Sequence, residues 1–196
     1  MRKKKGIIII MYGTYKMIKH STIRRVYETE DKEKFIKFLS DNKDFINSSD
    51  ITTLLRLAVY QRKADWVELL LEQGADPYST QGHIQTYPLY EAFQHACDGK
   101  WEVLDAFQKS GVSLQKLGEH EHESNCSLVY SFLKGNIEFA TYLISNGVKV
   151  SDYNSLMKSV LSEEFFNLLK DNPQIFSEYD LEKFEENKFN LLLSLS

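Results

Sequence analysis

Residues 53–76 read Thr-Leu-Leu-Arg-Leu-Ala-Val-Tyr-Gln-Arg-Lys-Ala-Asp-Trp-Val-Glu-Leu-Leu-Leu-Glu-Gln-Gly-Ala-Asp, and this stretch decides the fold. Its apolar residues recur at helical spacing on both sides of a polar segment, which predicts two short helices that each have one apolar face. Gly74 follows the second helix, where the left-handed backbone conformation favours glycine. Because a single helix pair cannot bury its apolar face, we expect it to stack on similar pairs. The residues on that face are Leu55, Ala58, Val67, Leu70 and Leu71.

Two further copies of this pattern follow along the chain, with openings at residues 87–92 and 126–131. Ala58 and Gly74 are 16 positions apart, but the corresponding Ala92 and Gly111 are 19 apart. We expect the three extra residues to lie near 96–98 and to lengthen the turn between the two helices. A second insertion lengthens the connection that holds residues 117–125. Weaker copies at residues 23–39 and 154–169 flank the three clear ones.

The repeated stretch resembles the ankyrin repeat, whose first helix opens with Thr-Pro-Leu-His-x-Ala and whose second continues Val-Val-x-Leu-Leu-Leu before Gly-Ala-Asp. Residues 53–58, 66–71 and 74–76 match these motifs without a gap, although Leu54 and Arg56 replace the family's Pro and His. The resemblance covers roughly residues 20–172. It implies an all-α ankyrin-repeat solenoid of about five helix-turn-helix repeats with atypical capping repeats. We therefore expect a repeat array over residues 21–172 and a C-terminal helical cap over residues 173–196.

The first 20 residues form a separate, basic leader in this interpretation. Arg2 to Lys5 precede an apolar run, as in a signal peptide, but the run at 7–12 is shorter than the roughly 7–15 residues of a signal core, and no cleavage site follows. We expect a disordered segment or a short strand, with Met11 and Met17 as alternative first residues. No apolar run approaches the roughly 18 residues of a membrane span, so no membrane contact is expected.

The charge distribution indicates the class of binding partner, and the cysteine content indicates the cellular compartment. The first 27 residues hold eight basic and no acidic side chains, which leaves 16 basic and 28 acidic ones, a net charge of −12, for the rest of the chain. Such an acidic body attracts basic protein surfaces and repels nucleic acid. Two cysteines, Cys97 and Cys126, do not make a disulfide framework. We therefore expect a reduced, cytoplasmic protein that is a monomer when free.

The ankyrin resemblance implies a binding surface made by the exposed side of the first helices and by the loops between repeats. Exposed tyrosines suit such a surface, since they bring contact area at low entropic cost. The alternative is that these residues are simply tolerated at the surface. The candidate partner-binding residues are Tyr60, Gln61, Tyr78, Gln81, His83, Gln85, Gln94, His95, His120, Glu121, His122 and Glu123.

Other sites have weaker support in the sequence. The run 120–123 alternates His and Glu, but a zinc site needs three or four ligands at fixed spacing, so we expect a solvated loop and no metal. There is no phosphate-binding glycine loop, nucleophile elbow or zinc-protease helix, so we expect neither catalysis nor a cofactor. Trp66 and Trp101 occupy corresponding positions of two second helices. We expect them to pack between repeats, because large aromatic side chains usually contribute burial.

These features favour a non-catalytic module that binds a protein, with a basic partner expected. One hypothesis is an inhibitor or immunity protein that neutralises a toxin, since nucleic-acid-cutting toxins tend to be basic and charge would speed their capture. The alternative is an adaptor, or an effector that an intracellular bacterium or a virus directs at its host. A more distant alternative is nucleic-acid binding through the basic N-terminal arm.

Overall fold

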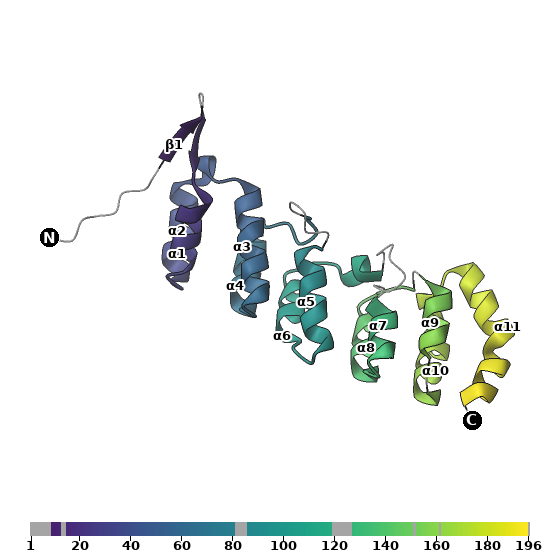
Figure 1. Cartoon of the computed structure of the whole chain (residues 1–196). Helices are drawn as coiled ribbons and strands as arrows, with labels where there is room; N and C mark the ends of the chain where they lie inside the picture. Colours follow the sequence, from purple (N-terminus) through teal and green to yellow (C-terminus); the bar gives the residue numbers. More distant parts are fainter. Residues whose placement is uncertain are drawn as a thin grey trace. The chain divides into compact units, whose positions relative to one another are not determined.

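The computed structural model describes residues 9–12, 15–80, 86–118, 127–150, 152–160 and 162–195. Most of these residues lie in α-helices, which follow one another as helix-turn-helix pairs (Figure 1). The helical class that the sequence predicts is therefore confirmed for this part of the chain. None of its helices is long and apolar enough to cross a membrane. The chain divides into two compact units, Met1–Pro88 and Leu89–Ser196.

Unit 1 contains one small sheet and two helix pairs. Strands β1 and β2 are antiparallel, with Ile9 opposite Ile18, and they lie directly before the first helix. Asp31 and Asn47 cap the second and third helices by accepting a hydrogen bond from a first-turn N–H, as capping residues do. The elements are β1 (Ile9–Tyr12), β2 (Tyr15–Ile18), α1 (His20–Tyr27), α2 (Lys32–Asp41), the 3-10 turn η1 (Lys43–Phe45), α3 (Ser48–Tyr60) and α4 (Ala64–Glu72).

An aromatic cluster joins the two helix pairs of unit 1. The Trp66 ring of α4 lies 4.6 Å from the ring of Tyr27 and 5.3 Å from that of Phe35, both edge-to-face. All three side chains are buried. The expected packing of Trp66 between repeats is thus confirmed. Edge-to-face rings add roughly 0.5–1.5 kcal/mol per pair to the gain from burial.

Unit 2 contains three further helix pairs and a long closing helix. Its elements are α5 (Pro88–Cys97), α6 (Glu102–Lys109), the 3-10 turn η2 (Leu114–Gly118), α7 (Ser127–Leu133), α8 (Ile137–Ser145), α9 (Tyr153–Ser159), α10 (Glu163–Lys170), the 3-10 turn η3 (Pro173–Ile175) and α11 (Glu178–Leu195). Trp101 lies before α6 and packs against Phe139 at 5.0 Å and Tyr142 at 5.1 Å. This confirms the packing expected for the second tryptophan. Phe184 of α11 is buried against Phe166 and Phe176.

Three glycines end second helices in the same way. Gly74, Gly111 and Gly147 have φ values of 85°, 78° and 79°, as the sequence predicts for the residue after each helix. At each site the next residue's N–H donates to a carbonyl five residues earlier, for example Ala75 to Leu70 at 3.0 Å. The repeated pattern therefore extends from the sequence to the backbone geometry.

The insertion near residues 96–98 mainly lengthens a helix, so the prediction that the turn holds all three extra residues is wrong. Helix α5 ends five residues after Ala92, whereas α3 ends two residues after Ala58. The turns that follow are residues 98–101 and 61–63, and so differ by one residue. The physical reason is burial: Ala96 and Cys97 are both buried, and they extend the apolar face of α5 by nearly one helical turn.

Candidate partner-binding surface

Helix α3 of unit 1 has one side that faces away from its core. Thr53, Arg56 and Tyr60 are three and four positions apart, so they lie along one side of the helix. Leu55, Ala58 and the other core positions of α3 are buried on the opposite side. Thr53 and Arg56 are half-buried, and Tyr60 is 78% exposed. We call these three residues the α3 outer face.

Arg56 joins this face to the loop that leaves α4. Its Nη2 donates a hydrogen bond to the Ser79 carbonyl oxygen at 3.0 Å and a second to the Thr86 carbonyl oxygen. Ser79 and Thr86 stand on either side of the loop, so one guanidinium holds both ends of it. Arg56 occupies the position where the ankyrin repeat, which the sequence resembles, usually has His. This difference is the one feature of the sequence that could have pointed to a special role for Arg56.

Further hydrogen bonds fix the start of the same loop. The Asp76 N–H donates to the Thr52 hydroxyl at 2.9 Å, and the Tyr78 N–H donates to the Asp76 carboxylate at 2.9 Å. The Tyr78 ring packs edge-to-face against Tyr87 at 6.3 Å. The side chain of Tyr78 is therefore half-buried and held in place, beside a loop base that Arg56 fixes. Tyr60 and Tyr78 thus both belong to unit 1, and Arg56, one helical turn before Tyr60, bonds to Ser79, the residue after Tyr78.

The other candidate residues fall into three groups. Gln61 is exposed but accepts a hydrogen bond from the buried Tyr27 hydroxyl at 2.9 Å, so it also supports the core. Gln94 is exposed and His95 half-buried, and both belong to α5 of unit 2. The remaining candidates lie outside the described residues, namely Gln81, His83, Gln85, His120, Glu121, His122 and Glu123.

The ion pairs and the shifted pKa values of unit 1 are accounted for by contacts that stabilise the fold. Glu30 pairs with Lys63 at 2.5 Å and Asp65 with Lys32 at 2.6 Å, which tie the α1–α2 pair to the α3–α4 pair. The Lys32 ammonium holds the pKa of the Asp65 carboxyl below its usual range. Burial, together with the nearby carboxylates of Glu30 and Asp65, raises the pKa of Tyr27 to about 12. None of these shifts prepares a group for catalysis near neutral pH.

Two further groups have chemistry that the sequence did not indicate. His20 Nδ1 lies 3.1 Å from Asp50 Oδ1 and links the start of α1 to α3 across 30 residues. Burial raises the pKa of the Cys97 thiol to about 12, so it stays protonated and weakly nucleophilic. Among the described residues, no group of three or more His, Cys, Asp or Glu side chains could hold a metal ion.

Comparison of the whole chain with models of protein families, with curated proteins and with solved structures gives no match in any of the three. Function is therefore inferred from the residues and their geometry. On that basis the α3 outer face, with the loop base that Arg56 holds, is the candidate binding surface of unit 1.

Proposed function

We propose that this chain is a non-catalytic protein-binding module built from degenerate ankyrin-type repeats. Successive helix pairs, glycines at equivalent positions and a hydrogen-bond pattern shared by three helix ends support this proposal. In this arrangement the exposed side of the first helices and the loops between pairs form the recognition surface, while the buried sides of both helices form the core.

The exposure of Tyr60 is the observation that carries the proposal. A tyrosine that is 78% exposed adds nothing to the core, yet its helix is held rigidly by the buried side opposite. Aromatic side chains on a preorganised surface are the common centres of binding energy in protein interfaces, where truncation of such a residue costs about 2 kcal/mol or more. Leu133 of α7 is 57% exposed at the equivalent position of its repeat in unit 2, which extends the pattern to a second first helix.

The charge of the chain supports a basic partner. Residues 28–196 hold 28 acidic and 16 basic side chains, a net charge of −12, and residues 28–88, which contain the α3 outer face, contribute −4 of it. Such a field speeds the approach of a basic protein, and the effect weakens with salt. An inhibitor or immunity protein that neutralises a basic toxin is the role we propose within this class. A gene for such a toxin beside the gene for this chain would support that role.

Site-specific cross-linking tests the proposed surface. Tyr60 is replaced by p-benzoylphenylalanine in the full chain, and the same probe at the exposed Lys37 of α2 provides the matched control. We expect the probe at position 60 to cross-link a basic protein in the native cell, and the probe at position 37 not to do so. Tyr60→Ala should then weaken binding of the purified partner at least tenfold, the equivalent of about 1.4 kcal/mol. Recovery of the same proteins from both positions would show that the α3 outer face is not the binding surface.

A further inference from the structure

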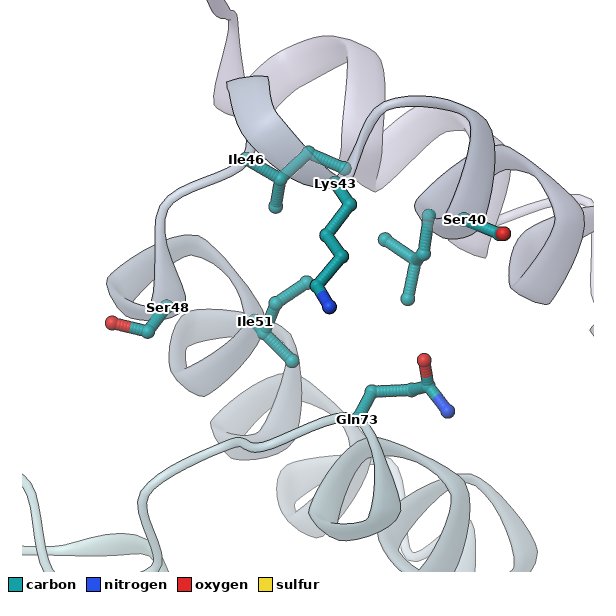
Figure 2. Close-up of a pocket in the computed structure, with 7 residues that line it drawn as sticks. Ser40, Lys43, Ile46, Ser48, Ile51 and Gln73 are labelled. Atoms are coloured by element: carbon teal, nitrogen blue, oxygen red, sulfur yellow. The ribbon is translucent and has the colours of Figure 1, made fainter.

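Unit 1 has a hollow at the opposite end of α3 from Tyr60. It lies where α2 ends, η1 follows, α3 begins and α4 ends, and it has a volume of about 380 Å³. Ligand pockets in proteins range from about 300 to 1,000 Å³, so the hollow can hold a small group. It is lined by Leu39, Ser40, Lys43, Ile46, Ser48, Ile51 and Gln73 (Figure 2).

The apolar part of the hollow consists of branched aliphatic side chains. Leu39 and Ile51 are buried, and Ile46 is half-buried. They come from α2, α3 and the residue after η1, and the surrounding helices hold them. A surface of this kind favours a small branched aliphatic group by burial, at about 25 cal/mol for each Å² of apolar area removed from water.

The polar part is formed by one cation and one amide. Lys43 and Gln73 extend toward the hollow from opposite sides, with the carbonyl oxygen of Gln73 turned toward it, whereas the hydroxyls of Ser40 and Ser48 point away (Figure 2). Lys43 has no ion-pair partner among the described residues, unlike Lys32 and Lys63. The described lining residues include no carboxylate. An ammonium beside an apolar wall matches a carboxylate that carries an aliphatic group.

We propose that this hollow binds a carboxylate attached to a short branched aliphatic group, as found at the C-terminus of a peptide that ends in leucine or in a free branched acid. Lys43 holds the carboxylate, and Leu39, Ile46 and Ile51 contact the aliphatic group. Ile51 and Tyr60 are nine residues apart on one helix, about 14 Å at 1.5 Å per residue. The site is therefore separate from the α3 outer face and does not depend on its function.

Titration of the full chain with three small probes, followed by isoleucine-methyl and amide NMR, tests this proposal. N-acetyl-leucine represents a peptide C-terminus, 4-methylpentanoate a free acid, and N-acetyl-leucine amide lacks the charge. We expect the methyl signals of Ile46 and Ile51 to move with at least one of the two acids and to move less with the amide. A response to only one acid identifies the source of the ligand. Equal responses to the amide and the acids, or no response to either acid at millimolar concentrations, would overturn the proposal.

Variants of Lys43 separate charge recognition from general contact. Lys43→Met keeps the aliphatic stem, and it should weaken acid binding about fivefold, the scale of an exposed ion pair. Lys43→Arg keeps the charge and should bind within about twofold of the native chain. Lys37→Met removes an exposed charge from the preceding helix, α2, without touching the hollow, and it should leave binding unchanged. If Lys43→Met binds as well as Lys37→Met while both remain folded by circular dichroism, Lys43 does not hold the carboxylate.

Discussion

Replacing Arg56 with methionine would release the loop base from the α3 outer face. Methionine has an unbranched side chain that matches the aliphatic stem of arginine, so it preserves most of the packing along α3 but lacks the guanidinium. The bonds to the Ser79 and Thr86 carbonyls are then broken, and both ends of the loop lose their shared contact. The Asp76 and Tyr78 hydrogen bonds remain, because neither involves Arg56.

The expected loss is about 2 kcal/mol. A hydrogen bond to a charged group contributes about 1.5–3 kcal/mol in net terms. Two independent hydrogen bonds would stabilise the loop base by more than about 2 kcal/mol. Here both bonds come from the single Nη2 of a half-buried side chain, so together they contribute about as much as one strong bond. Local opening at this cost speeds amide exchange roughly 30-fold.

Hydrogen–deuterium exchange of Arg56→Met measures that change directly. The amides of Ser79, Thr80, Thr86 and Tyr87 should exchange faster, while those of Asp76, Tyr78 and the core of α4 keep their protection. Arg25→Met, which removes an exposed arginine from α1, is the matched control and should leave the loop base unchanged. If the loop base of Arg56→Met exchanges as slowly as in the control, the guanidinium does not hold the loop, and the proposed rigidity of the binding surface loses its main support.

Three further predictions concern stability and can be checked by denaturant unfolding. Trp66→Ala should destabilise the chain by about 3–5 kcal/mol, because its ring is buried, whereas Trp101→Ala, at a half-buried position, should cost less. Arg62→Gly should stabilise the chain by about 0.5–1 kcal/mol, because Arg62 has a left-handed φ of 58° that glycine adopts without strain. A less stable variant would contradict this reasoning. Burial and the 3.0 Å hydrogen bond to Asp105 raise the pKa of Tyr142 above its ordinary value. The stability from this bond is therefore complete below about pH 10 and is lost as pH rises further, so Tyr142→Phe should be less stable at neutral pH and lose less on alkalinisation.

Helix positions could be predicted from the sequence because apolar spacing and glycine placement are local signals. The weak copy at residues 23–39 illustrates this, since α1 and α2 form there although their motif is degraded. The number of residues inserted after Ala92 could be predicted, but their location could not. Residue spacing does not reveal whether the extra residues belong to a helix or to a turn. Burial of Ala96 decides that question, and burial depends on the neighbouring helices.

The site itself was harder to predict, for a physical reason. The exposure of Tyr60 could be predicted because its position on the first helix is set by local periodicity. The role of Arg56 could not, since its acceptors are backbone carbonyls 23 and 30 residues away, and a carbonyl has no sequence signature. The hollow around Lys43 escaped prediction for a similar reason, because its walls come from separate elements that meet only after folding.

Strain at Arg62 connects stability with the proposed binding surface. Two turns of unit 2 have glycine at this left-handed position, Gly99 and Gly135, whereas unit 1 has Glu30 and Arg62. Glu30 forms an ion pair with Lys63. Arg62 lies two residues after Tyr60, so a contact with the partner would offset the strain. Arg62→Gly should then be more stable yet bind the partner more weakly than the native chain, whereas unchanged binding would leave the strain at Arg62 without a functional explanation.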